Sequence, residues 1–275
     1  MEHSITMHGS DGRSNLSSPL FRSFEDAVSA CGSGYEDPAL IEVVADKSER
    51  LLRKIACNPM EIDQENAHRL AMIHRCMPSS RVAVIDIGGA CGYYYHLYKR
   101  LFGDSGLVSW CVVETPSMVA AAKARRFGDT KLTFIDSLEK VPSVAADFPA
   151  FVLCSSVLQY FPSPAEVVEA LASLRPETIL VTRTPLSTYS ERLISLQISN
   201  LRDNGPGPLP KKFSDRKITY PVVFEPLETI KHAFERNSYM VDVIEEQDGT
   251  LLFDGASINS HFTLIAQKSF ESTRE

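Results

Sequence analysis

The chain has 275 residues, of which 44% are hydrophobic and 23% charged, and its formal net charge is −7. This length and composition predict a globular protein with one large domain, or one domain and an appendage. The negative charge argues against a nucleic-acid partner, because such binding depends on clustered Lys and Arg. No apolar run approaches the roughly 18 residues that a membrane span needs.

The six cysteines do not form a metal-binding pattern. None belongs to a C-x-x-C pair, so we expect no zinc centre. The polar N-terminal stretch lacks the apolar core of a signal peptide. A reducing cytoplasm is therefore the expected location.

The part of the chain before the first predicted strand reads as a tail and a helical appendage. Residues 1–19 are rich in Ser, Gly, His and Asn, which predicts a disordered tail. Residues 20–80 predict helices. Asp37 before Pro38 has the pattern of an N-cap followed by proline at the first helical position. A further helix is predicted over residues 62–75.

Strand and helix patterns alternate over residues 81–268. This alternation predicts an α/β fold, with a Rossmann-like, seven-stranded, mostly parallel sheet flanked by helices. Ser163 to Glu166 (S-P-A-E) predicts a capping box. The strands are expected at residues 82–85, 107–113, 131–135, 150–155, 178–182, 239–245 and 262–267.

The alternation lapses over residues 186–222, which we interpret as an insertion and a candidate lid. A helix is expected near residues 190–200. The Gly- and Pro-rich stretch 202–216 is a long loop, and loops of this length commonly carry function. Residues 269–275 predict a second tail.

The first predicted strand of this domain ends in a turn that is poor in side chains, D-I-G-G-A-C-G. Such a turn allows a ligand to approach the backbone closely. The dinucleotide spacing G-x-G-x-x-G/A fails in both registers, because Tyr93 and Cys91 stand where small residues are needed. An acid-x-G-x-(G/A)-x-G pattern fits instead. Its members are Asp86, Gly88, Ala90 and Gly92, with Gly89 between them.

A second acid, Glu114, ends the next strand, about 20 residues after the turn. A carboxylate at this position can accept hydrogen bonds from the two hydroxyls of a ribose. Asp136 and Ser137 follow the third strand, where they suit contacts to an adenine ring or, alternatively, a helix cap. The order of acid, glycine turn and acid favours a nucleoside-containing cofactor.

The glycine turn resembles motif I of class I S-adenosylmethionine-dependent methyltransferases. The run V-L-C-S-S-V-L-Q-Y-F-P-S-P (Val152 to Pro164) is similar to their motif IV. Other phrases resemble a family of bacterial methyltransferases that is associated with surface-polysaccharide genes. These phrases are F-R-S-F-E-D-A, I-G-G-A-C-G-Y-Y-Y, W-C-V-V-E, V-T-R-T-P-L and I-T-Y-P. The resemblance spans about residues 20–245 and implies S-adenosyl-L-methionine as cofactor, with Ser155 and Ser156 beside it.

The residues near this turn and after the fourth and fifth strands are candidates for acceptor chemistry. His96 and Tyr160 are the candidate general bases, although a lone histidine in a helix is more often structural. Arg183 is a candidate clamp for an acceptor carboxylate or phosphate, or else a surface ion-pair partner. The candidate substrate-binding residues are Tyr95, Gln159, Gln197 and Tyr220.

The sequence thus predicts methyl transfer to an oxygen of a small-molecule or sugar-linked acceptor, without a metal. Such a transfer needs a nucleophile held close to the methyl group in a site that excludes water. One alternative is a catalytically inactive regulatory protein that binds S-adenosylmethionine, which the substituted Ala90 favours. Another is an NAD-dependent oxidoreductase, which the failed glycine spacing disfavours. A homodimer is compatible with the sequence.

Overall fold

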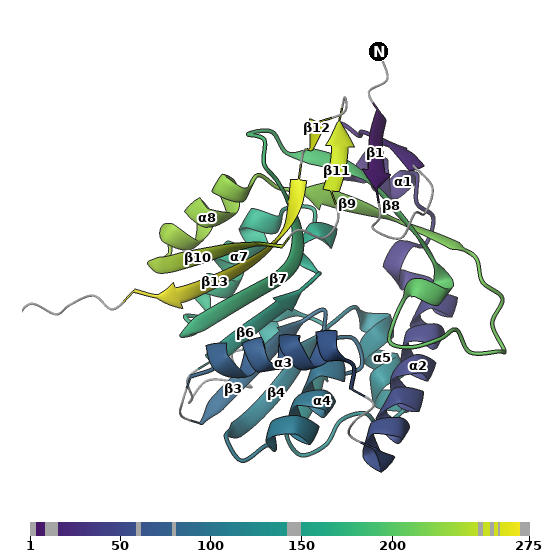
Figure 1. Cartoon of the computed structure of the whole chain (residues 1–275), viewed down its shortest axis with the longest axis vertical. Coiled ribbons are helices and arrows are strands. Elements are labelled where there is room, and N and C mark those ends of the chain that lie inside the picture. Colours follow the sequence, from purple (N-terminus) through teal and green to yellow (C-terminus); the bar gives the residue numbers. More distant parts are fainter. Residues whose placement is uncertain are drawn as a thin grey trace, which may run out of the picture. The chain divides into compact units, whose positions relative to one another are not determined.

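The computed structural model describes residues 4–8, 16–58, 62–78, 81–141, 150–246, 250–253, 256–257 and 259–269. Its largest sheet contains β3 (Val82–Ile87), β4 (Leu107–Val113), β5 (Leu132–Ile135), β6 (Ala150–Ser155), β7 (Thr178–Ser187), β10 (Tyr239–Glu246) and β13 (Asn259–Lys268). The strand order is β10-β13-β7-β6-β3-β4-β5 (Figure 1). The predicted seven-stranded Rossmann-like sheet is therefore confirmed. The order reverses at β3, and ligands of open α/β sheets bind at such a switch point.

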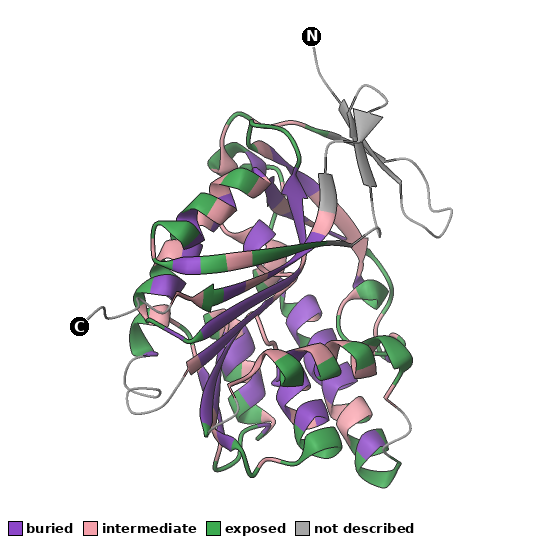
Figure 2. Cartoon of the chain, turned by 60° about the vertical axis from the view of Figure 1, so that its left-hand side comes forward, coloured by how far each residue is buried: buried purple, intermediate pink, exposed green. Residues whose placement is uncertain are grey.

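The chain divides into two compact units, which are described separately. Unit 1 comprises residues 1–30, 154–197 and 221–275, and unit 2 comprises residues 31–153 and 198–220. In unit 2, β4 pairs in parallel with β3 and with β5. All six residues of β3 are buried, and Figure 2 shows the buried strands in purple. This burial explains why β3 reads as a continuous apolar run up to its acid, since parallel strands are covered on both faces.

Two helices of unit 2 begin at a residue whose side chain caps the first turn. The Asp37 carboxylate accepts from the N–H groups of Ala39 and Leu40, at 2.9 and 3.2 Å, and confirms the predicted N-cap. Thr115 Oγ1 likewise accepts from the N–H of Met118 at 3.4 Å. The helices are α2 (Pro38–Cys57), α3 (Gln64–Cys76), α4 (Tyr93–Phe102) and α5 (Pro116–Ala124). Short 3₁₀ turns form η1 (Gly34–Glu36), η3 (Leu138–Lys140) and η5 (Leu201–Asp203).

Unit 1 contains the two closing strands, and both predicted strands are confirmed. β13 is antiparallel to β7 and to β10. Its helices are α1 (Phe24–Ser29), α7 (Pro164–Ser173) and α8 (Leu227–Glu235), with η4 (Leu158–Tyr160) before α7. The Ser163 side chain makes no capping hydrogen bond, so the predicted capping box is wrong, although Pro164 does begin α7. No helix in the described ranges is long and apolar enough to cross a bilayer.

Two sequence predictions fail where strands find partners far along the chain. Ser4–His8 (β1) and Leu16–Pro19 (β2) pair with each other, and β1 also pairs with β11 (Thr250–Phe253), so these segments are not a disordered tail. β12 (Ala256–Ser257) completes that sheet. β8 (Leu193–Asn200) is a strand paired with β9 (Lys217–Phe224), where a helix was predicted. The remaining tail residues, 1–3, 9–15 and 270–275, lie outside the described residues.

Candidate functional site

The turn after β3 adopts a backbone that suits small residues. Gly88, Ala90 and Gly92 have φ of 69°, 49° and 74°, in the left-handed region that glycine enters at least cost. The N–H of Gly92 donates to the carbonyl of Gly89 at 2.9 Å, and the N–H of Gly88 donates to the Val113 carbonyl at the end of β4 at 2.9 Å. The turn is therefore fixed at the carboxyl edge of the sheet.

Asp86 supports this turn from beneath. Its carboxylate is 1% exposed, and it accepts from Trp110 Nε1 at 3.1 Å. A Cβ added at Gly89 would lie 2.5 Å from Asp86 Oδ2, so glycine is required there. Burial raises the pKa of Asp86 to about 7, opposed by the Trp110 hydrogen bond and reinforced by the charge of Glu114. Asp86 thus packs beneath the turn and shapes it, and its role as a cofactor-binding residue stays a prediction.

Glu114 joins the end of β4 to the glycine turn. Its Oε1 accepts from the N–H of Ala90 at 3.0 Å, and its Oε2 accepts from the N–H of Thr115 at 2.9 Å. A carboxylate has about four acceptor positions, so each oxygen keeps capacity for a further donor. This is the capacity that two ribose hydroxyls require. Burial and the charge of Glu36 raise the pKa of Glu114, and the hydrogen bonds from the two backbone N–H groups lower it by less.

Asp136 and Ser137 lie at the same edge, directly after β5. The N–H of Glu114 donates to the Ile135 carbonyl at 3.0 Å, which places the ends of β4 and β5 side by side. Asp136 is exposed and forms an ion pair with Lys140. Ser137 Oγ accepts from the N–H of Glu139 at 3.2 Å. The structure therefore places both residues beside Glu114, and Ser137 also forms the helix cap that the sequence left open.

Tyr95 and His96 do not lie at this edge. The Tyr95 hydroxyl donates to Asp129, at 2.7 Å to Oδ2, ahead of β5, and the side chain is fully buried. This position corrects the prediction that Tyr95 binds substrate, because strand carboxyl ends and the start of β5 are on opposite edges. Burial lowers the pKa of His96, while Asp129 and the backbone of Phe127 raise it. His96 thus belongs to the same packed region as Tyr95.

A second group of predicted residues comes together in unit 1, after β6. Ser155 Oγ accepts from Arg183 Nε and Nη2 at 3.3 and 3.1 Å, and lies 3.0 Å from Thr182 Oγ1. Gln159 Nε2 donates to Ser156 Oγ at 3.1 Å. These five side chains come from the end of β6, from the residues directly after it, and from the interior of the neighbouring strand β7. The sequence did not single out Thr182, which lies inside a buried strand.

Tyr160 and Gln197 also meet in unit 1, whereas Tyr220 belongs to unit 2. The Tyr160 hydroxyl donates to Gln197 Oε1 at 3.0 Å. The Tyr220 hydroxyl lies 3.0 Å from Ser199 Oγ, and its ring stacks on Tyr35 at 4.3 Å between centroids. Tyr220 is 2% exposed, which is the packing of a structural tyrosine.

The connection between β8 and β9, residues 201–216, is fastened to α2, and we call it the strap. Lys47 is 2% exposed, and its Nζ donates to the carbonyls of Arg202, Asn204 and Gly205, at 2.6, 2.7 and 3.3 Å. Arg216 Nη2 donates to both carboxylate oxygens of Asp37, at 2.7 Å each. The strap is thus an ordered part of unit 2.

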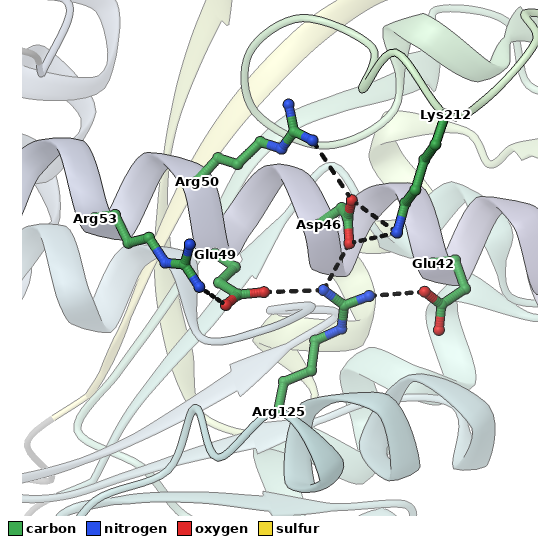
Figure 3. Close-up of polar contacts among 7 residues, drawn as sticks. All are labelled: Glu42, Asp46, Glu49, Arg50, Arg53, Arg125 and Lys212. Carbon is green, nitrogen blue, oxygen red and sulfur yellow. Dashed lines mark hydrogen bonds and ion pairs between the residues drawn. The ribbon is translucent and has the colours of Figure 1, made fainter.

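An ionic network extends this attachment along α2 (Figure 3). Arg125, after α5, pairs with Glu42 and Asp46 at 2.7 Å each and with Glu49 at 3.1 Å. Lys212 of the strap reaches Asp46 at 3.0 Å. Asp46 therefore connects α5 and the strap through one carboxylate. No feature of the local sequence signals these contacts, since their members are far apart in the chain.

Metal binding is not indicated in the described part of the chain, where no group of three or more His, Cys, Asp or Glu residues is placed to hold an ion. The chemistry available at the edge of unit 2 is instead that of a carboxylate, backbone N–H groups and a close-approach turn.

Comparisons with known proteins bear on the fold. No protein-family model matches the chain, and no curated protein matches it. The N-terminal domain of EvdMO1, in a crystal structure in the presence of SAH and D-fucose, has a TM-score of 0.51 at 15% identity, over 75% of this chain and 84% of that one. The same domain with SAH bound gives 0.51 at 16% identity, over 76% and 84%. This chain has a Rossmann-like methyltransferase fold. At such identity the similarity concerns the fold alone.

Proposed function

We propose that this protein transfers a methyl group from S-adenosyl-L-methionine to an oxygen of a small-molecule or sugar-linked acceptor. The observation that carries the proposal is the Glu114 carboxylate, which is hydrogen-bonded to Ala90 of the glycine turn and retains acceptor capacity on both oxygens. A ribose diol beside a close-approach turn satisfies both features. The similar domain crystallised with SAH supports the choice of cofactor.

The residues present fit this cofactor. Glu114 would hold the ribose hydroxyls, and Gly88 to Gly92 would leave room for the rest of the molecule. Asp136 and Ser137 lie beside Glu114, where they would contact the adenine ring. Asp86 would act through the turn that it supports. Ser155, the last residue of β6, and Ser156 stay sequence-based predictions of further cofactor contacts.

The cofactor supplies an electrophilic methyl group on a positively charged sulfur. Methylation of an acceptor hydroxyl would form a carbon–oxygen bond, break the carbon–sulfur bond with S-adenosylhomocysteine as the leaving group, and require a base for the hydroxyl proton. Tyr160 is the candidate for that proton; its hydroxyl donates to Gln197 Oε1 at 3.0 Å, so it would act as a base only as the phenolate, after its own proton has passed to water. The packed position of His96 disfavours it for this role.

The acceptor class rests on two supports. Hydroxyl, amide and guanidinium groups gather between the end of β6 and the middle of β7, as recognition of a polar acceptor requires. The similar domain was crystallised in the presence of D-fucose, which directs the proposal toward sugars. The surface-polysaccharide association, the homodimer and the cytoplasmic location remain predictions from the sequence.

Titration calorimetry with S-adenosylmethionine and S-adenosylhomocysteine tests the proposal. Both ligands should bind the wild-type protein, and Glu114→Gln should weaken binding by roughly tenfold or more, because one carboxylate oxygen becomes an amide donor. Glu139→Gln, an exposed residue of η3, is the matched control and should bind normally. Absence of binding to the wild type would overturn the proposal. Binding of NAD in its place would identify an oxidoreductase, and cofactor binding without turnover over broad acceptor pools would identify the regulatory alternative.

A further inference from the structure

Two strained residues stand side by side in unit 1. Ser156, after β6, has φ of 55°, and Arg183, in β7, has φ of 51°. The N–H of Ser156 donates to the carbonyl of Thr182 at 2.9 Å, which holds the two positions together. Left-handed backbone at residues other than glycine costs free energy and clusters at binding sites. The paired strain singles out this point of the fold.

Arg183 brings a positive charge that the described residues do not neutralise. Its guanidinium donates to Ser155 Oγ, and no carboxylate in the described part of the chain forms an ion pair with it. Two other arginines of unit 1 do have such partners: Arg192 pairs with Glu225, and Arg236 pairs with Glu169. The planar guanidinium can bind a carboxylate or phosphate through two parallel hydrogen bonds.

Gln159 adds an unsatisfied polar atom to the same place. Its side chain is 3% exposed, and its Nε2 donates a hydrogen bond to Ser156 Oγ. Its Oε1 is buried and has no hydrogen-bond partner among the described residues. If the amide is turned over, the other end is left without a partner instead, so either assignment leaves one buried group to be satisfied. A buried polar group of this kind calls for a ligand atom or an ordered water.

We propose that Ser155, Ser156, Gln159 and Arg183, here named the anion subsite, bind an acceptor that carries a carboxylate or phosphate close to a hydroxyl, as an acidic sugar does. Arg183 holds the anion, and the Gln159 amide bonds the neighbouring hydroxyl. This inference rests on the proposed function for the role of the bound molecule as methyl acceptor. The geometry of the subsite itself does not depend on the cofactor.

The test compares three probes by saturation-transfer NMR and calorimetry on the full chain: D-glucuronate, D-glucose 6-phosphate and neutral D-glucose. Arg183→Asn is the informative variant, because asparagine tolerates the left-handed backbone and removes the charge. Arg175→Asn is the matched control. Arg175 is exposed, also has a positive φ (57°), and lies outside the subsite. Arg183→Lys keeps the positive charge but removes the planar guanidinium that can form two parallel hydrogen bonds.

We expect at least one anionic probe to bind the wild type roughly tenfold or more tightly than glucose, as a charge-assisted contact predicts. The preference should disappear in Arg183→Asn, persist in Arg175→Asn and be reduced in Arg183→Lys. Tighter binding of D-glucuronate would identify a carboxylate as the preferred anion, and tighter binding of D-glucose 6-phosphate would identify a phosphate. Gln159→Met, similar in volume, should weaken the binding of glucose and of the acids alike. Equal affinity for all three probes, or an anion preference that survives in folded Arg183→Asn, would overturn the inference.

Binding of S-adenosylhomocysteine, measured separately, distinguishes the two possible failures. A wild-type protein that binds S-adenosylhomocysteine and shows no anion preference contradicts the anion subsite alone. A wild-type protein that prefers the anionic probes and does not bind S-adenosylhomocysteine contradicts the proposed methyl transfer and leaves the subsite standing.

Discussion

The N–H of Ala90 donates to the carboxylate of Glu114 across 3.0 Å, so the glycine turn after β3 and the end of β4 form one hydrogen-bonded unit. Ala90 has a left-handed backbone at φ 49°, and that conformation directs its N–H toward the acid. The strain at Ala90 and the position of Glu114 are therefore linked. A substitution at either residue should therefore change the conformation of the other.

The affinity for S-adenosylhomocysteine should depend on pH through Glu114. The ionised carboxylate accepts hydrogen bonds from ribose hydroxyls, whereas the protonated form loses acceptor capacity. Burial raises the pKa of Glu114, so affinity should fall as pH decreases, and the fall should begin above the ordinary titration range of glutamate near pH 4.3. Calorimetry from about pH 5 to 8 measures this. Glu114→Gln should bind S-adenosylhomocysteine more weakly, and its affinity should not change with pH in this range. If the affinity of that variant falls as steeply with decreasing pH as that of the wild type, a group other than Glu114 is titrating.

Ala90→Gly should stabilise the folded protein by up to about 1 kcal/mol, because glycine relieves the cost of a positive φ. The greater entropy of glycine in the unfolded chain offsets part of the gain. Urea denaturation provides the measurement. Ala121→Gly, in the interior of α5, is the opposite control and should lose about 1 kcal/mol. A destabilised Ala90→Gly protein would show that the Ala90 methyl group has a packing role.

Asp86 should make the protein less stable as pH rises from about 4 to about 7. The pKa of Asp86 is raised to about 7 in the folded state, against about 3.9 in the unfolded chain. The folded state therefore binds more protons in this window, and the free energy of unfolding falls with increasing pH. The full difference corresponds to at most about 4 kcal/mol.

The variant Asp86→Asn should flatten that part of the stability profile while keeping an acceptor for Trp110. Urea midpoints at several pH values between 4 and 7 give the comparison. Asp136→Asn is the control at an exposed carboxylate. Its pKa is lowered by Lys140, so that substitution should remove a small contribution that is lost only at acidic pH. If the free energy of unfolding of Asp86→Asn falls with pH as steeply as that of the wild type, another group is titrating in this range.

Lys47→Met should release the strap. The substitution removes the donor to three strap carbonyls, and we expect a loss of roughly 2 kcal/mol in unfolding free energy. Trypsin should also cut faster after Lys211 and Lys212, which are exposed in the strap. Lys54→Met, at an exposed position on the same helix, should change neither property. If the strap stays resistant to trypsin in Lys47→Met, the Asp37–Arg216 and Asp46–Lys212 pairs are what hold it in place.

Features that are local in the chain could be predicted from the sequence. The buried strand before the turn, the spacing of Asp86, Gly88, Ala90 and Gly92, and the N-cap at Asp37 all depend on neighbouring residues. Hydrophobic periodicity and backbone preference act over a few residues, so these patterns can be interpreted without a structure. The alternation of strands and helices, which predicted the Rossmann-like sheet, is the sum of such local patterns.

Features that join distant segments depend on how the whole chain packs. β8 is a strand because β9 pairs with it, although its own sequence is compatible with a helix. Asp86 accepts a hydrogen bond from Trp110, Tyr95 is buried against Asp129, and Lys47 is covered by the strap. The physical reason is that burial and hydrogen-bond satisfaction are properties of the packed chain. A residue type shows which bonds a side chain can make, and packing decides which of them it does make.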